Sequence, residues 1–329
     1  MKRRKRTRDR ARLVRALLLV AVTSAVPAAL FACGSRTGLF ADETTSSGGP
    51  GGGDGGADAT TDRATSDVRD ALPPIETGPR EDASRDDCPD ADSTLVYLVT
   101  EDNELMSYNP PSGAFRTIGI LACPASTTAT PFSMAVDRKG TAFVVFSDGS
   151  LFRVSTATGA CVKTTYVSGQ SGFQTFGMGF STEGLGPAES LFVAGDGQGS
   201  SASGLARIDT TTFKLTAIRD FFPSIDRAEL TGTGDGNLFA FYTKFDKPGS
   251  FVGQIDKTNA RVVAESALPT VEQGQGWAFA FWGGDFYLFT APGGGSTVTR
   301  FRPADGSVTA VGSWPSVIVG AGVSTCAPQ

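Results

Sequence analysis

The sequence predicts an all-β chain organised as a five-bladed β-propeller, and three observations support this prediction. Glycine accounts for 41 of the 329 residues, nearly twice its ordinary share of about 7%. After residue 93, five segments of similar pattern recur with a period of about 47 residues. Each segment contains short β-type runs separated by turn residues, which matches a four-stranded propeller blade with its typical repeat of roughly 40–50 residues.

The repeat is clearest at one turn that joins two β-type runs. These turns start at Asn109, Ser155, Asp209, Asp256 and Arg302, and they are rich in Pro, Asp, Asn, Thr and Gly, the residues that favour tight turns. The runs before them are Leu105–Tyr108, Leu151–Val154, Leu205–Ile208, Val252–Ile255 and Val298–Phe301. Runs such as Phe115–Ile118 and Val308–Val311 follow them and predict the outermost strands.

A more apolar run precedes each of these pairs. The five runs are Leu95–Val99, Ala142–Phe146, Leu191–Ala194, Leu238–Phe241 and Phe286–Phe289. They do not alternate polar with apolar residues, so both faces of each strand must be covered. Before four of them lies a further short run, which predicts an innermost strand: Ser133–Val136, Gly177–Phe180, Glu229–Gly232 and Trp277–Ala280.

The first repeat lacks its innermost strand, and the chain ends with a spare one, Val317–Thr325. We expect this strand to enter the N-terminal blade and close the ring, so that residues 94–329 form one propeller domain. A six-bladed ring is the alternative. Cys326 ends the spare strand and Cys88 precedes the strand with which it would pair, which predicts a Cys88–Cys326 bridge.

Cys123 and Cys161 remain as a second disulfide pair, which suits an exported protein. Against this pairing, Cys161 sits near the start of one outer strand and Cys123 follows the end of another. These positions favour opposite rims of the ring.

Residues 1–32 have the pattern of an export signal. Nine basic residues up to Arg15 precede the apolar run Ala16–Ala32, which contains Pro27 and is shorter than the ~20 residues of a spanning helix. The junction Leu30-Phe-Ala-Cys33-Gly34 resembles the lipobox of bacterial lipoproteins. The resemblance implies that Cys33 is acylated and that its lipid anchors the protein to a membrane of the bacterial cell envelope. Gly34, in place of an acidic residue, implies the outer membrane. An ordinary signal peptide with an unrelated Cys is the alternative.

Residues 33–93 predict a disordered linker after the acylated Cys. Seven of the twelve residues in Ser47–Asp58 are Gly, and the sequence that follows is rich in Thr, Asp, Ser and Pro. Such a composition buries too little apolar surface to offset the entropy of ordering. A flexible chain of this length has a root-mean-square reach of about 40 Å, enough to hold a domain clear of a lipid surface.

Composition excludes several functions. The chain has no histidine, which removes Ser-His-Asp and Cys-His catalysis and His-ligated zinc. After residue 32 it carries 20 basic and 33 acidic residues, so nucleic acid is a poor partner. Asp137, Asp148, Asp235 and Asp305 lie beside or near glycines and are interpreted as turn caps. No metal site and no cofactor are therefore expected.

The run Asp137–Val154 resembles the repeats of NHL and gluconolactonase-like propellers, and this resemblance extends over about 236 residues. It is a resemblance of scaffold, because the metal ligands of the enzymes among those families have no counterpart motif in this sequence. The resemblance therefore implies a propeller and no activity.

The residues predicted to contact a ligand are Glu229, Trp277 and Trp282, which lie near the ends of innermost strands. Propeller ligands commonly bind where loops of every blade converge on the axial channel. We expect a non-enzymatic module without catalytic residues that recognises an unknown protein, peptide or glycan. A histidine-free, carboxylate- or metal-dependent hydrolase and a passive structural protein of the envelope are the alternatives.

Overall fold

A computed structural model describes residues 72–77, 88, 94–184, 186–197 and 202–329, all of which belong to one compact unit, Thr65–Gln329. The expected signal peptide (1–32), Cys33 and most of the expected linker (33–93) lie outside the described residues. The described part of the chain forms twenty β-strands. It contains no helix long and apolar enough to cross a membrane.

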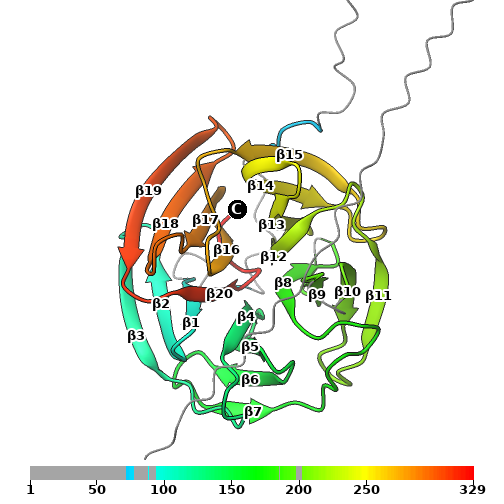
Figure 1. The fold of residues 1–329 in the computed structure, drawn as a ribbon, viewed down its shortest axis with the longest axis vertical. Coiled ribbons are helices and arrows are strands. Elements are labelled where there is room, and N and C mark those ends of the chain that lie inside the picture. The colour runs from blue at the N-terminus through cyan, green and yellow to red at the C-terminus, as the bar shows by residue number, and fades with distance from the viewer. Residues whose placement is uncertain (1–71, 78–87, 89–93, 185, 198–201) are drawn as a thin grey trace, which may run out of the picture. The chain divides into compact units, whose positions relative to one another are not determined.

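The twenty strands form five antiparallel four-stranded sheets, arranged as blades around one axis (Figure 1). This arrangement confirms the predicted five-bladed propeller. In chain order the strands are β1 Val96–Thr100, β2 Glu104–Asn109, β3 Ala114–Ile120, β4 Pro131–Val136, β5 Thr141–Phe146, β6 Leu151–Ser155, β7 Cys161–Lys163, β8 Phe176–Thr182, β9 Glu189–Gly195, β10 Gly204–Ile208, β11 Leu215–Asp220, β12 Asp226–Gly232, β13 Leu238–Lys244, β14 Lys247–Ile255, β15 Val262–Leu268, β16 Trp277–Trp282, β17 Asp285–Thr290, β18 Ser296–Arg302, β19 Ser307–Trp314 and β20 Ile318–Val323. From the axis outward, the blades are β20-β1-β2-β3, β4 to β7, β8 to β11, β12 to β15 and β16 to β19.

The C-terminal strand closes the ring, as the sequence predicts. Strand β20 pairs antiparallel with β1, from Val96 opposite Val323 to Thr100 opposite Ile318. The expected bridge between Cys88 and Cys326 is present, with the two Cα atoms 5.4 Å apart and 238 positions between the residues in sequence. By the chain-entropy account, closing so long a loop stabilises the fold by roughly 5 kcal/mol at most.

The second pair, Cys123 and Cys161, is also bonded, with a Cα–Cα distance of 5.1 Å. The twist of the blades explains how these two residues meet although their positions in the strands favour opposite rims. Each strand is rotated by about 20–25° from its neighbour, so three steps turn an outermost strand well away from the axis. The outermost strands consequently run around the circumference (Figure 1), and the end of β3 meets the start of β7 in the next blade.

Two pairs of neighbouring innermost strands, β8 with β12 and β20 with β4, pack backbone against backbone at glycines. A Cβ atom on Gly177 would lie 2.1 Å from the carbonyl oxygen of Ala228, and one on Gly232 would lie 2.2 Å from that of Phe180. On β20, a Cβ at Gly322 would come within 2.7 Å of the amide nitrogen of Val136. Real Cβ atoms do not approach other atoms so closely, so these positions require glycine.

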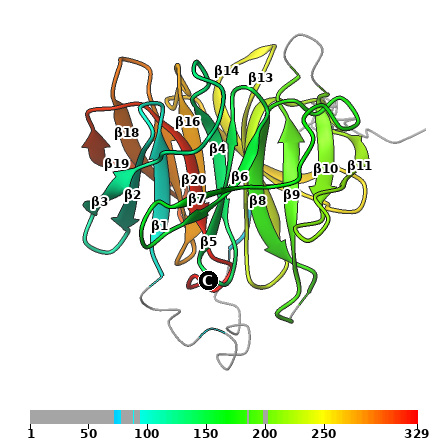
Figure 2. The same cartoon turned by 90° about the horizontal axis from the view of Figure 1, so that it is seen from below.

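The same contacts show that neighbouring innermost strands run in one direction, and this defines two rims. The mouth rim is the rim where β4, β8, β12, β16 and β20 begin. The C-terminal rim is the rim where they end, and it carries residues 324–329 and the Cys88–Cys326 bridge. Figure 2 shows the C-terminus at one rim and the β13–β14 hairpin at the opposite one.

Aromatic side chains fill the space between blades. Phe279 and Phe286 stack with ring centroids 5.3 Å apart, and Phe239 meets the edge of Phe286 at 4.9 Å. All three side chains are buried between β13 and the strands of the last blade. Offset and edge-to-face pairs of this kind contribute beyond the area that they bury.

The repeated turns that revealed the fold lie at the C-terminal rim. In three of them an aspartate caps the turn. Asp209 Oδ1 accepts hydrogen bonds from the amides of Thr211 and Thr212, and Asp256 Oδ1 accepts one from the amide of Thr258. Asp305 does the same for Ser307. These contacts explain the aspartates as local turn formers.

Residues 72–77 fall within the stretch expected to be linker, and they pack against the fourth and fifth blades. The amide of Glu265 on β15 donates to the carbonyl of Pro73 at 2.7 Å, and Thr77 donates to the carbonyl of Gly284 at 3.0 Å. Ile75 is buried among side chains of β13 to β17. One isolated apolar residue leaves no periodicity, so the sequence gives no sign of this contact.

The innermost glycines lead to a stability prediction. Gly232→Ala should lower the free energy of unfolding by about 3 kcal/mol, because the added methyl group overlaps the backbone of β8. Gly293→Ala is the matched control, since a Cβ there meets no atom within 4 Å. Urea denaturation of both variants measures the difference. Equal midpoints for the two variants would contradict the backbone-to-backbone packing.

Candidate functional site

The propeller axis is closed at the C-terminal rim. Ala327 is buried there, and the carbonyl of Pro328 accepts a hydrogen bond from the amide of Gly283. Arg138 donates to Thr325 and to the sulfur of Cys88, while Thr325 donates to Glu189. These contacts tie the C-terminal segment across the end of the axis.

Halfway along the axis, the innermost strands leave essentially no free volume between residues such as Gly179, Leu230 and Gly322. At the mouth rim the axis opens into a cavity of about 190 Å³. Its walls include Glu101, Pro131, Phe132, Glu229, Trp277 and Val319. We name it the mouth cavity, and it is the candidate functional site.

Glu229 occupies the inner wall of the mouth cavity and is only 2% exposed. It lies on β12, and its Oε2 accepts a hydrogen bond of 2.8 Å from the hydroxyl of Ser133 on β4. The same hydroxyl accepts one from the amide of Met178 on β8. Gly177, the residue before Met178, has no side chain that would collide with the backbone of Glu229. Strands β4, β8 and β12 can therefore approach closely enough to meet at the Ser133 hydroxyl.

Burial raises the pKa of Glu229 well above its usual value near 4.5, and the hydrogen bonds from Ser133 and Met178 only partly oppose this effect. No Lys or Arg among the described residues pairs with it. Innermost strands β4, β8, β16 and β20 carry no ionisable side chain at all. Burial without a positive partner therefore favours the protonated form of Glu229.

Trp277 lies at the start of β16 and forms another wall of the mouth cavity. The guanidinium of Arg227 is 3.9 Å from its ring centroid and donates a 3.0 Å hydrogen bond to the carbonyl of Gly274. Burial lowers the pKa of Arg227, and Asp226 partly opposes this. The indole nitrogen of Trp277 is buried without a hydrogen-bond partner among the described residues. The stacked pair gives the cavity a rigid aromatic wall.

Trp282, the third residue predicted for the site, lies at the other end of β16 and so at the C-terminal rim. Its indole nitrogen donates to the carbonyl of Thr94 at 2.9 Å, which fixes the entrance of the chain into the first blade. The structure therefore brings Glu229 and Trp277 together and places Trp282 apart from them.

Glu101 is a wall residue that the sequence analysis did not single out. It lies in the β1–β2 connection, and its amide donates to the carbonyl of Val317 just before β20. The connection Glu101–Asn103 looks like an ordinary polar hairpin. Only ring closure by β20, which is bonded to β1, brings this hairpin to the axis.

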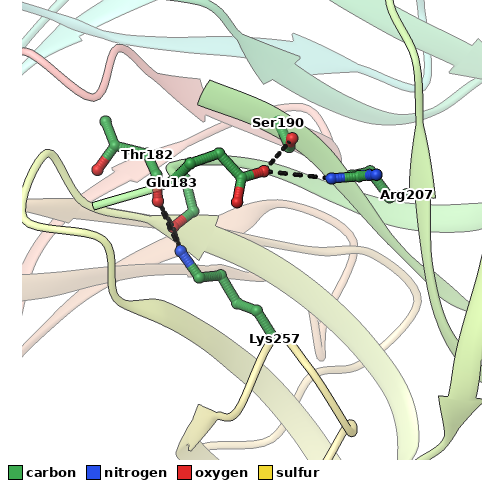
Figure 3. A network of polar contacts seen from close by, with 6 residues as sticks. Thr182, Glu183, Ser190, Arg207 and Lys257 are labelled. Carbon is green, nitrogen blue, oxygen red and sulfur yellow. Dashed lines mark hydrogen bonds and ion pairs between the residues drawn. The ribbon is translucent and has the colours of Figure 1, made fainter. Parts of the chain in front are cut away.

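A second polar cluster lies between the third and fourth blades at the C-terminal rim (Figure 3). Glu183 accepts a hydrogen bond from Ser190 and pairs with Arg207 at 3.5 Å, while Lys257 donates to the carbonyl of Thr182 at 2.6 Å. Beside it, the β10–β11 turn borders a shallow polar hollow of about 430 Å³. The Glu183–Arg207 pair is half-exposed, and the polar groups of the cluster are bonded to one another. We therefore interpret the cluster as a surface contact that links the two blades.

The described residues contain no group of three or more Cys, Asp or Glu side chains arranged to hold a metal ion. The aspartates interpreted as turn caps bond to their own turns, as Asp137 does with the amides of Lys139 and Thr141. Asp148 accepts hydrogen bonds from Ser126 and Ser150, which lower its pKa to about 2 although partial burial opposes them.

No protein-family profile matches the chain, and no curated protein sequence is significantly similar to it. Solved structures with similar architecture include a chain of the nidogen/laminin complex, with 10% identity over 70% of this chain and 98% of that one and a TM-score of 0.46. Kuenenia stuttgartiensis hydrazine synthase shares 14% identity over 65% of this chain and 64% of its own, with a TM-score of 0.39. TolB from Acinetobacter baumannii shares 14% over 66% of this chain and 52% of its own, with a TM-score of 0.38. Identities and scores this low carry nothing about ligands or partners over to this chain.

The raised pKa of Glu229 leads to a pH prediction. An acid that holds its proton more tightly when folded makes the native state bind more protons than the unfolded state, so stability falls as pH rises above about 4.5. The fall continues up to the folded pKa, with a slope of at most about 1.4 kcal/mol per pH unit. Glu229→Gln should lack this contribution. Its free energy of unfolding, measured in urea from pH 4 to 9, should therefore gain on that of the wild type as pH rises. Parallel curves would contradict the raised pKa.

Proposed function

We propose that the domain is a non-catalytic recognition module that binds its partner at the mouth rim. One observation carries this proposal: the otherwise closed propeller axis opens at that rim into a cavity walled by a buried carboxyl group and an aromatic ring. Concave sites with apolar walls and a few convergent polar groups are the usual form of ligand sites.

The surface around the mouth cavity supports this choice of rim. Among the described residues, seven large apolar side chains are exposed, and two of them lie at the mouth rim: Phe245, and Val167, whose neighbour Ser168 lies beside Gly149 in the β5–β6 connection. Four others are on the outermost strands β3, β7, β15 and β19, and Phe222 packs against the β14–β15 turn. Phe245, at the tip of the β13–β14 hairpin, has its whole side chain in solvent. An exposed aromatic side chain beside a cavity favours contact with a protein.

The anchoring belongs to the same proposal. Lipid on Cys33 holds the protein at the bacterial outer membrane, and the linker lets the propeller reach away from it. Disulfides Cys88–Cys326 and Cys123–Cys161 support export, because such bonds persist in oxidising compartments. Two parts of the expected linker are described by the structure. Residues 72–77 lie on the flank of the fourth and fifth blades, and Cys88 lies at the C-terminal rim. No described residue before Glu101 lines the mouth cavity, and the acidic domain disfavours nucleic acid as a partner.

A hydrolase is the second candidate, and one observation favours it. Glu101 and Glu229 line the same cavity, and a pair of carboxyl groups can act as general acid and general base in hydrolysis without histidine. Glu229, whose burial favours the protonated form, would be the acid, and Glu101 would be the base.

Cross-linking in native cells followed by mass spectrometry identifies the partner and tests the recognition site. Glu229→Gln combined with Trp277→Ala should leave the melting temperature within a few degrees of the wild type and reduce capture of that partner at least tenfold. The matched control, Thr211→Ala with Lys214→Ala, changes the hollow at the C-terminal rim and should leave capture unchanged.

Survival of capture in the mouth variant with loss in the control variant would move the site to the C-terminal rim. Turnover of a sugar or ester substrate by the purified protein, abolished by Glu229→Gln, would favour the hydrolase instead.

Lipidation has its own test. Growth with a clickable palmitate analogue should label the wild-type protein and leave Cys33→Ser unlabelled, because only Cys33 follows the lipobox-like junction. The variant should also move from the membrane to the soluble fraction. Cys88→Ser is the matched control and should still be labelled. Equal labelling of wild type and Cys33→Ser would contradict the anchor.

A further inference from the structure

The mouth cavity contains an acid whose counter-charge is missing. Glu229 is nearly fully buried, lines the cavity and bonds through Oε2 to an uncharged hydroxyl. Arg227, two residues before Glu229 in the sequence, is engaged elsewhere: its guanidinium stacks on Trp277 and donates to the carbonyl of Gly274. A buried carboxylate is stable only when a positive charge or several donors compensate it.

The cavity matches one long side chain in size and wall chemistry. Its volume of about 190 Å³ corresponds to roughly six water molecules, which is less than a drug-sized ligand fills. Pro131, Phe132, Val319 and Trp277 provide apolar walls, and the carboxyl group of Glu229 lies among them. An aliphatic stem that ends in a cation satisfies both the walls and the carboxyl group.

The charge of the mouth rim points to the same ligand. Its ten strand connections contain six acidic residues and no Lys or Arg: Glu101, Asp102, Asp148, Asp196, Asp246 and Glu272. The strand-end residues at this rim add three acidic and three basic ones, which cancel. The connections and C-terminal residues at the other rim hold six acidic and five basic residues. The excess of negative charge is thus concentrated around the mouth cavity, where it attracts cations.

We propose that the mouth cavity binds the ammonium or guanidinium group of a Lys or Arg side chain that projects from a partner protein, with the carboxylate of Glu229 as its counter-ion. This rests on the proposed recognition function and names the chemistry of the partner. The exposed side chain of Phe245 at the same rim then contacts the surface that carries the basic residue.

Binding moves one proton. Burial favours the neutral carboxyl group of Glu229 in the free site, and a ligand cation favours its carboxylate, so the proton of Glu229 is released to solvent on binding. Affinity therefore rises with pH up to the folded pKa of Glu229, at most tenfold per pH unit. The other charged groups near the site are Glu101 in the cavity wall and Asp226 and Arg227 on β12. Strands β4, β8, β16 and β20 contribute none.

The full chain, labelled with ¹⁵N at its tryptophans and purified in detergent, provides the test. It contains three tryptophans, of which Trp277 is at the cavity, while Trp282 at the opposite rim serves as internal reference. The probes are Nα-acetyl-lysine methylamide, the norleucine analogue with the same stem and no ammonium, and methyl glucoside. The lysine probe should shift the Trp277 indole resonance, leave that of Trp282 in place, and bind at least tenfold more tightly than the norleucine probe.

Glu229→Gln should weaken binding of the lysine probe at least tenfold and remove its pH dependence, with both disulfides and the near-ultraviolet circular dichroism retained. Asp305→Asn, at a C-terminal-rim turn, is the control and should bind as the wild type does. Equal affinities for lysine and norleucine, or undiminished binding to Glu229→Gln, overturn the counter-ion role. A Trp277 shift with methyl glucoside alone overturns the cationic ligand and leaves recognition at the mouth standing. Absence of any shift overturns the inference, and the cross-linking result then judges the proposed function separately.

Discussion

Direct contact between the backbones of neighbouring innermost strands is the constraint on which this structure depends. Five blades around one axis bring these strands so close that side chains do not fit between them at Gly177, Gly232 and Gly322. The glycines therefore set how tightly the ring closes. Glycine weakens ordinary strands, but at these positions the close approach of two backbones requires it. Larger residues at these positions would force the blades apart along the whole axis.

The candidate site is a consequence of the same packing. Because the strands touch along most of the axis, the free volume at its mouth lies directly above a closed floor, and a side chain there is shielded from water. Glu229 reaches Ser133 across β8 because Gly177 has no side chain. The residue type that closes the ring therefore also makes room for the buried carboxyl group. Shielding of this kind favours the protonated form of the carboxyl group, which is why the pKa of Glu229 is raised.

The contacts that stabilise ring closure lie at the C-terminal rim, and the candidate site lies at the mouth rim. The C-terminal rim holds the Cys88–Cys326 bridge, the capped turns, and the cluster of Arg138, Glu189 and Thr325 that ties down the last residues. Its charges are nearly balanced and its polar side chains have partners. The mouth rim has fewer such contacts, an acidic excess and exposed apolar side chains. Closure thus occupies one end of the axis and leaves the other available for a ligand.

The sequence by itself determined the blades, because turn residues and apolar runs repeat at a constant interval and each blade is built from local hairpins. It also determined ring closure, since the unpaired C-terminal strand and its cysteine have no other place in a ring. The tertiary structure decided what the two ends of each strand face. Trp277 and Trp282 are five positions apart on β16, and only the direction of that strand along the axis separates them into the cavity wall and the opposite rim. Glu101 joins the site through the pairing of β1 with β20, Ile75 packs from a stretch with no pattern, and Cys123 meets Cys161 because blade twist carries the end of β3 to β7. These contacts join residues that are distant in sequence, and their geometry depends on the twist and closure of the whole ring rather than on any local pattern.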